Sequence, residues 1–278
     1  MSSIIDNLKD GLKYPLYEPK KIGLLAALYC IIFALFFASL YVFIGSLKQA
    51  INVHMLVEGS KMLPTVLSSS SIAEISIFLI ISVIVSLFIT GYLYEIIKFT
   101  IEGKNNLPKF DNFKNMFING VKVTVVMIVY SIVPSILSNI SVKLSSSQPT
   151  IALVVGIIAV ILGIILTLMG IMAVNNMAAN NNSLKSAFNR KGILALISSI
   201  GWIRFIGALI FLALVGIIIL IATLLISILI TVIFALAGEI GSYIGLFIAL
   251  IIIVLVISYL EIVSYRFYGS LYNEAIKE

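Results

Sequence analysis

The chain has 278 residues, of which 61% are hydrophobic and only 11% are charged. So few charged side chains leave too little polar surface to keep a globular chain of this length in water, which excludes a soluble domain. The formal net charge of +6 is spread over basic residues that occur singly or in pairs beside apolar stretches. We therefore expect no nucleic-acid partner, and we expect these charges to meet anionic lipid head groups.

Six apolar stretches are each long enough for a helix to cross about 30 Å of hydrocarbon. They lie near residues 22–45, 75–94, 123–140, 151–174, 205–237 and 240–260. The sequence therefore predicts an all-α, polytopic integral membrane protein, a helical bundle of six transmembrane helices that forms a single domain over residues 1–278.

The lysines and arginines are divided unevenly between the two sides of the predicted membrane. Fifteen of the 18 lie in the two tails and in the gaps after the second and fourth spans, and three lie in the other gaps. Because basic residues are retained on the cytoplasmic side, this asymmetry predicts a multi-pass protein of the cell membrane with both termini in the cytoplasm.

Three short segments on the predicted cytoplasmic side carry apolar residues at helical spacing. They precede the first, third and fifth spans, and their apolar residues are Ile4, Ile5, Leu8 and Leu12; then Phe110, Phe113 and Phe117; then Ile193, Leu196, Ile197, Ile200 and Ile203. Each segment is too short to cross a membrane, so we expect three amphipathic helices in the interface, the second with Asp111 as its N-cap. The chain then divides into three units of an amphipathic helix and a helical pair. This division indicates either a true repeat or the ordinary pairing of six helices.

Small residues recur along two of the spans. Gly156, Gly163 and Gly170 repeat every seven residues, and Gly241 and Gly245 form a ladder with Ala249. Such stripes let a neighbouring backbone approach closely, so they predict helix packing. We expect this packing to be within the chain, although association between copies uses the same motifs and the oligomeric state stays open.

The sequence carries no recognisable reaction chemistry. The only histidine, His54, is expected in an outer loop, and no nucleophile elbow, phosphate-binding loop or dinucleotide fingerprint is present. We therefore predict no catalytic, cofactor-binding or metal-binding residues, and no enzyme. A lipid-modifying enzyme would need the carboxylates on the predicted cytoplasmic side to converge on one pocket, and these are Glu95, Glu102, Asp111 and Glu261.

A distinctive run of residues lies between the second and third spans. It comprises Gly91-Tyr92-Leu93, Ile96-Ile97-Lys98, Thr100-Ile101-Glu102-Gly103, Leu107-Pro108, Phe110-Asp111-Asn112-Phe113 and Met116-Phe117-Ile118-Asn119-Gly120, with Leu12-Lys13-Tyr14-Pro15 and Ala187-Phe188-Asn189 elsewhere. Together these residues resemble the archaeal membrane family known as domain of unknown function 4013. The resemblance implies an archaeal, mainly methanogen, multi-span protein with no assigned activity, and it supplies no catalytic residue.

The part of this run that connects the two spans, residues 102–112, is called the elbow below. Glu102 and Gly103 begin it, and we expect Gly103 to end the second span in a left-handed C-cap. Pro108 belongs to the turn, while Phe110 and Asp111 lead into the next helix. Two interpretations are open: a structural elbow, or a docking surface for a cytoplasmic protein partner, since the turn carries exposed charge.

These features favour a non-enzymatic, membrane-organising or lipid-associated component. Its expected partners are membrane lipids and a membrane or cytoplasmic protein. The alternative is a carrier for a small or apolar solute, which a cavity reaching the bilayer midplane or a helix broken at Pro134 would favour. Against the carrier, the cores of all six predicted spans lack ionisable residues.

Overall fold

The computed structural model describes residues 4–56 and 68–277, and within these residues it contains helices and no strand. The elements in chain order are α1 (Ile4–Lys13), the 3-10 helix η1 (Tyr14–Tyr17), α2 (Pro19–Leu56), α3 (Ser69–Ile101), α4 (Phe113–Leu144), α5 (Pro149–Ala179), α6 (Leu184–Ala187), α7 (Arg190–Ile200), α8 (Trp202–Ala235) and α9 (Glu239–Ala275). Six of them, α2, α3, α4, α5, α8 and α9, are long and apolar enough to cross a membrane. The predicted all-helical, six-span architecture is confirmed.

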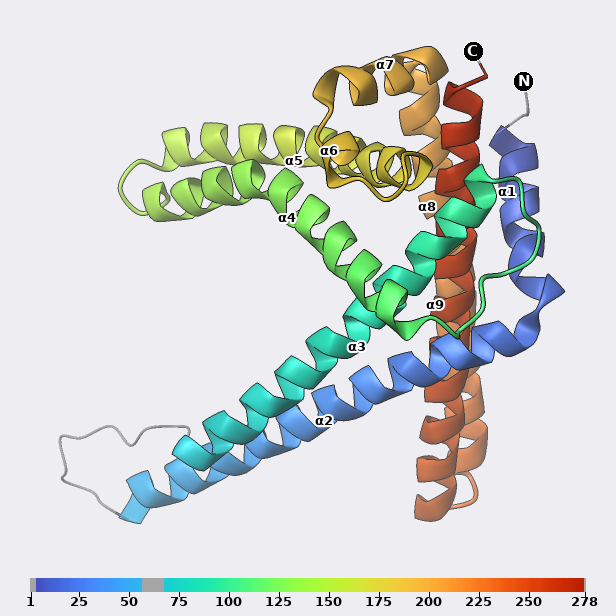
Figure 1. Ribbon diagram of the computed structural model, residues 1–278. Coiled ribbons are helices and arrows are strands. Elements are labelled where there is room, and N and C mark those ends of the chain that lie inside the picture. The colour runs from blue at the N-terminus through green and yellow to red at the C-terminus, as the bar shows by residue number, and fades with distance from the viewer. Residues whose placement is uncertain (1–3, 57–67, 278) are drawn as a thin grey trace.

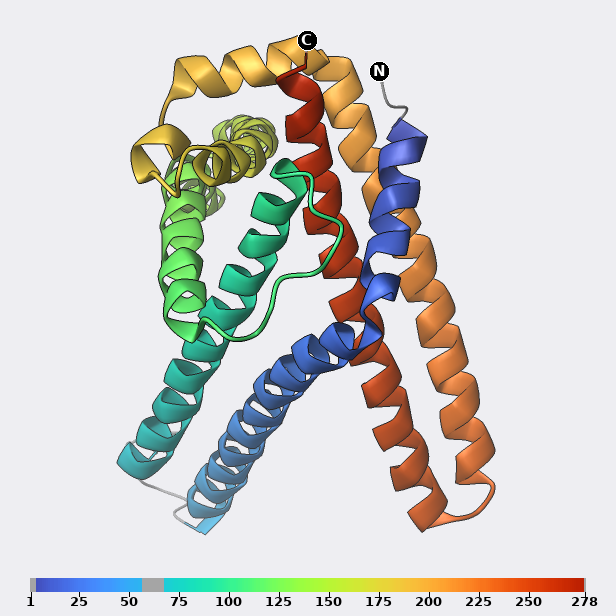
Figure 2. The ribbon, with the colours of Figure 1, turned by 45° about the vertical axis from the view of Figure 1, so that its right-hand side comes forward.

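The six long helices form three hairpins, α2–α3, α4–α5 and α8–α9, which meet at one end and diverge toward the other (Figures 1 and 2). The end where they meet, together with α1, α6 and α7, is called the hub; both chain termini lie there. Along the diverging parts, large apolar side chains such as Ile80, Val160 and Ile218 are more than half exposed. This exposure suits contact with lipid chains.

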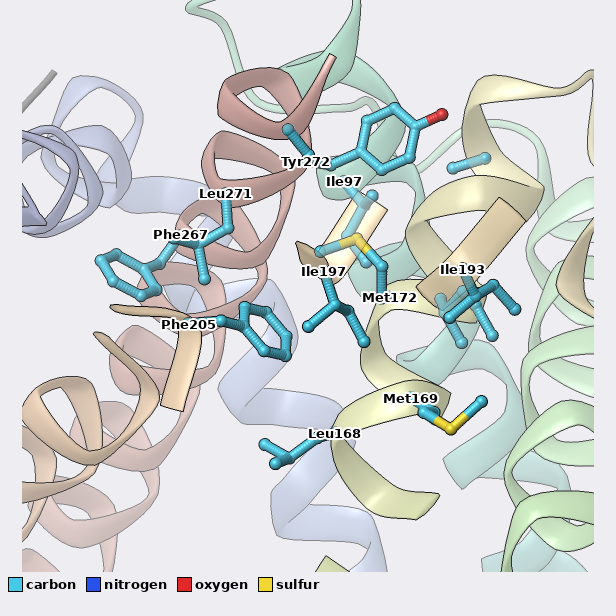
Figure 3. Close-up of a cluster of buried hydrophobic side chains, with 14 of the residues drawn as sticks. Ile97, Leu168, Met169, Met172, Ile193, Ile197, Phe205, Phe267, Leu271 and Tyr272 are labelled. Carbon is cyan, nitrogen blue, oxygen red and sulfur yellow. The ribbon is translucent and has the colours of Figure 1, made fainter. Parts of the chain in front are cut away.

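The core of the hub is built by side chains from several hairpins. Figure 3 shows Met172 of α5, Ile193 and Ile197 of α7, Phe205 of α8 and Phe267 of α9 gathered in one buried cluster. The helices continue past the apolar stretches seen in the sequence because their ends are buried in this cluster. For α9, the predicted span ends near residue 260, whereas the helix runs to Ala275.

The two separate amphipathic helices use their apolar faces for packing within the protein. In α7, Ile193, Ile197 and Ile200 are buried in the hub, whereas Ile203, at the start of α8, is 90% exposed. In α1, Leu8 is likewise buried in the core of the hub. The periodic pattern therefore has an explanation in tertiary packing, and the location of these helices in the membrane interface stays a prediction.

The prediction of a separate amphipathic helix before the third span is wrong. Phe113 starts α4, which continues without a break to Leu144, and Phe110 lies outside the helix. Asn112, not Asp111, is the N-cap, because its side-chain oxygen accepts a hydrogen bond from the Asn115 backbone N–H at 3.2 Å. Nothing between Phe113 and the apolar stretch interrupts the backbone hydrogen bonds of the helix, so the two parts form one element.

Two further local predictions are corrected by the helix bounds. His54 lies in the last turn of α2 and not in a loop. Pro134 lies inside α4, which is continuous across it, although Figure 1 shows the helix changing direction along its length. A proline removes one backbone hydrogen bond and clashes with the preceding turn, which accounts for a bend without a break.

Glycines permit the closest helix contacts in the structure. A Cβ atom on Gly91 of α3 would lie 1.7 Å from the carbonyl oxygen of Met116, and one on Gly120 of α4 would lie 1.9 Å from that of Leu87. The backbones of α3 and α4 therefore touch at this crossing, which joins the first hairpin to the second. Both glycines belong to the distinctive run described above, but sequence reasoning did not predict this contact, because the two glycines are isolated and form no repeat.

The glycine stripes predicted from the sequence face partners within their own hairpins. Cβ atoms on Gly156 and Gly170 would lie 3.0 and 3.2 Å from side chains of α4, and one on Gly163 would lie 3.7 Å from Pro134. On α9, a Cβ atom on Gly241 would lie 2.1 Å from the Phe234 carbonyl oxygen of α8, and one on Gly245 would lie 3.0 Å from the Thr231 Cα. Within the chain, these glycines set how closely the two helices of a hairpin approach.

Replacing Gly120 by alanine is expected to separate α3 from α4 and to lower the free energy of unfolding by roughly 1–3 kcal/mol. The matched control is Gly216→Ala in α8, where an added Cβ atom has no neighbour within 4 Å, and where alanine is the better helix former. Unfolding of both variants in mixed detergent micelles would test this. An equal effect of the two substitutions would contradict the close crossing.

Candidate functional site at the elbow

The elbow begins where α3 ends in a left-handed turn. Gly103 has a φ of +73°, a conformation in which glycine carries no steric penalty. Its N–H donates to the Thr100 carbonyl at 3.1 Å, and the Lys104 N–H donates to the Phe99 carbonyl at 2.8 Å. These bonds satisfy carbonyl groups at the end of α3 and turn the chain away from the helix axis.

The segment around η1 holds the backbone of the elbow. The Tyr14 hydroxyl donates to the Asn106 carbonyl at 2.8 Å, and the Lys21 ammonium donates to the Leu107 carbonyl at 2.6 Å. In return, the Leu107 N–H donates to the Glu18 carboxylate at 2.9 Å, which also pairs with Lys21 at 2.6 Å. The hydrogen bond from Lys21 is the largest influence holding the pKa of Glu18 below its usual value, whereas burial raises the pKa of Tyr14.

Arg266 of α9 joins the elbow to two other parts of the hub. Its side chain is only 7% exposed. The Nε atom donates to the Asp10 carboxylate of α1 at 2.7 Å, and the two terminal nitrogens donate to the Lys104 carbonyl at 2.8 Å and the Asn105 side-chain oxygen at 3.1 Å. The guanidinium also stacks on the Tyr14 ring at 4.4 Å. Sequence reasoning counted Arg266 only as a charge of the C-terminal tail, since no local pattern reveals partners in α1 and the elbow.

On its other side, the elbow closes a cavity of about 290 Å³, called the elbow pocket. It lies between the end of α3, the elbow, the start of α4 and the turn that follows α5. Most of the residues that line it are polar or charged, and a few are apolar. The lining comprises Glu95, Lys98, Phe99, Asn106, Pro108, Lys109, Asp111, Asn112, Asn115, Met116 and Asn182.

Several polar groups of the pocket are held in place by hydrogen bonds from residues outside its lining. The buried Asn119 amide donates to one oxygen of Glu95 at 2.6 Å. The Tyr94 hydroxyl donates to the side-chain oxygen of Asn182 at 2.8 Å, and Lys122 donates to the backbone carbonyl of the same residue at 2.9 Å. Within the described residues the amide N–H groups of Asn182 donate to no other group, so they are available as donors for a ligand.

The pocket brings together some of the residues predicted from the sequence and leaves others apart. Pro108 and Asp111 line it, whereas Glu102 lies outside the lining and pairs with Lys104 at 2.5 Å. Phe110 stacks on Tyr92 with ring centroids 3.8 Å apart. The contacts made by the elbow backbone and by Phe110 favour the structural interpretation, while docking of a protein partner stays a prediction.

The four carboxylates that a lipid-modifying enzyme would use do not converge. Glu95 and Asp111 line the elbow pocket, but Glu261 accepts a hydrogen bond from the Tyr29 hydroxyl on α2. Within the described ranges, no group of three or more His, Cys, Asp or Glu side chains is arranged to hold a metal ion. The pocket combines acids with lysines, which suits an organic ion that carries both charges.

One family model matches residues 75–231, and its description reads "Protein of unknown function (DUF4013)". The matched segment contains every residue that lines the elbow pocket, but it ends before α9 and Arg266. No curated protein and no solved structure matches the chain. The family resemblance seen in the sequence is confirmed, and the archaeal origin that it implies stays a prediction.

Replacing Arg266 by methionine is expected to lower the free energy of unfolding by roughly 1–3 kcal/mol, because it removes the charged donor that joins Asp10, Lys104 and Asn105. Hydrogen exchange of the elbow amides should also become faster. The control is Lys191→Gln, which removes a positive charge from an exposed position of α7. Unchanged stability and exchange in the Arg266 variant would show that the hub does not depend on this side chain.

The contact between Glu18 and the elbow should weaken in acid. Because its pKa is lowered in the folded protein, the contact contributes stability above the ordinary glutamate pKa of about 4.3 and loses it as the pH falls through the lowered value. The side chain is 36% exposed, so solvent screening limits the contribution to less than about 1 kcal/mol. We expect the stability difference between wild type and Glu18→Gln to shrink below pH 4; a constant difference from pH 3 to 7 would contradict this.

Proposed function

Since the chain belongs to the DUF4013 family of proteins of unknown function, we propose that it is a non-enzymatic, membrane-organising component that associates with lipid. In this proposal, the elbow pocket binds the phosphate group of a lipid head group. The observation that carries the proposal is the presence of two lysines, Lys98 and Lys109, in one polar pocket at the hub ends of α3 and α4.

The two lysines have charge available for a ligand. Among the described residues, neither Lys98 nor Lys109 forms an ion pair or a hydrogen bond through its ammonium group. The pocket also reaches the first turn of α4, where the partial positive charge of the helix dipole favours an anion. Lysines, side-chain amides and a helix N-terminus together form the usual chemistry of a phosphate site.

The position of the pocket gives a bound head group a structural consequence. The α3 helix belongs to the first hairpin and α4 to the second, while Arg266 ties the elbow to α9 of the third. A ligand in the pocket would therefore contact elements whose relative positions set the divergence of the hairpins. This arrangement supports a role in organising helices and lipids and requires no reaction.

The carrier is the second proposal, and a groove along α4 and α5 is the feature in its favour. The groove has a volume of about 930 Å³ and is lined by Pro134, Ser135, Ser138, Asn139, Ser141, Ser145, Pro149, Ala152, Leu153, Gly156, Ile157, Ala159, Val160 and Ile161. It runs along a single hairpin, and no charged side chain lines it. Together with the continuity of α4 across Pro134, this makes alternating access the weaker proposal.

Extraction of the protein in detergent-free lipid particles, followed by mass spectrometry of the accompanying lipids, would test the proposal. We expect enrichment of a phospholipid over the bulk membrane. The double variant Lys98→Gln with Lys109→Gln should lower this enrichment about tenfold, which corresponds to the loss of about 1.4 kcal/mol of binding free energy.

The matched control removes the same charge from exposed positions outside the pocket, through Lys191→Gln with Lys277→Gln. An equal loss of phospholipid in both double variants would assign the enrichment to general surface charge. A stoichiometric protein partner without an enriched lipid would instead favour the docking interpretation of the elbow.

A further inference from the structure

We infer that the ligand of the elbow pocket carries a protonated primary amine beside its phosphate, as in a phosphoethanolamine group. This inference rests on the proposed phosphate site and deepens it. Besides its two lysines, the pocket contains the carboxylates of Glu95 and Asp111. A purely anionic ligand would form no favourable contact with these carboxylates.

Glu95 is oriented with one oxygen occupied and the other available. Asn119, which is only 3% exposed, donates to Oε1 at 2.6 Å. Over the described part of the chain, no hydrogen bond involves Oε2, and no basic side chain forms an ion pair with Glu95 or Asp111. Lys98, one turn away on α3, offsets the burial of the Glu95 carboxylate only in part because it forms no ion pair with it, and a ligand ammonium would offset more of the cost.

The two kinds of charge come from two segments that line the pocket. Glu95 and Lys98 lie one turn apart on α3, while Lys109 and Asp111 belong to the elbow. Each segment therefore offers one acid and one base. A compact ligand with both charges can satisfy acid and base groups at once, whereas a ligand of one charge is repelled by half of them.

The size of the pocket and the geometry of its acceptors favour a primary amine over a quaternary one. A volume of about 290 Å³ accommodates a small head group and leaves acyl chains outside. A primary ammonium offers three N–H donors to carboxylate oxygens, whereas a trimethylammonium group has none. Quaternary ammonium recognition also relies on a cage of aromatic rings, and the pocket contains only one aromatic side chain, Phe99.

The test compares the retention of three lipids with identical chains and different head groups by the purified full-length protein in nanodiscs, read out by native mass spectrometry. The head groups are ethanolamine, choline and glycerol, each attached to a phosphate. We expect wild-type protein to retain the ethanolamine lipid about tenfold more than the other two. The Glu95→Gln variant should retain the three lipids about equally, since it keeps the phosphate site and loses the ammonium site.

Two controls separate this inference from the proposed function. Glu102→Gln removes a carboxylate of the elbow that lies outside the pocket lining, and it should leave the ethanolamine preference unchanged. Lys98→Gln with Lys109→Gln should lower the retention of all three lipids. Equal retention of the three lipids by wild type, together with a loss in the lysine variant, would overturn the ammonium inference and keep the phosphate site.

Soluble phosphoethanolamine distinguishes a lipid from a free solute. If it displaces the ethanolamine lipid from wild type and not from Glu95→Gln, the shared head-group chemistry is supported. If it binds the protein in detergent while no lipid is enriched, the ammonium inference stands and the lipid association of the proposed function is overturned. Unchanged retention of all lipids in both the lysine and the Glu95 variants would overturn both.

Discussion

The buried guanidinium group of Arg266 is the interaction on which the hub depends. It contacts α1 through Asp10, the elbow through Lys104 and Asn105, and the ring of Tyr14. Because the three hairpins diverge away from the hub, contacts at their far ends cannot compensate for its loss. A charge that is expensive to bury is stable here because each of its three nitrogen atoms donates to an oxygen atom.

The elbow pocket is a consequence of two constraints that act from opposite sides. The glycine contacts at Gly91 and Gly120 bring the backbones of α3 and α4 together, and the segment from Tyr14 to Lys21 fixes the elbow by hydrogen bonds to its backbone. The carboxylate and amide groups of the pocket are then held in place, with some of their hydrogen-bonding atoms available for a ligand. A site made in this way needs little reorganisation to bind a small ion.

The amphipathic patterns of α1 and α7 show why periodicity alone does not identify what covers an apolar face. The same spacing suits lipid and protein, and here Leu8, Ile193 and Ile197 contact the buried core of the hub. Ile203, which continues the same stripe in the sequence, is almost fully exposed because Gly201 interrupts the helix with a φ of +87°. The change of backbone direction at Gly201 therefore places Ile193 and Ile197 in the protein core and leaves Ile203 exposed.

The sequence by itself determined the six membrane helices, because span length and apolarity are local properties set by the thickness of the hydrocarbon core. It also located the turn at Gly103, since a left-handed C-cap depends on a single residue. Only the tertiary structure decided that Arg266 reaches Asp10 across most of the chain, and that Glu95, Lys98, Lys109 and Asp111 line one pocket. These features require contacts between helices, and contacts between distant residues leave no periodic signal in a chain of similar apolar segments.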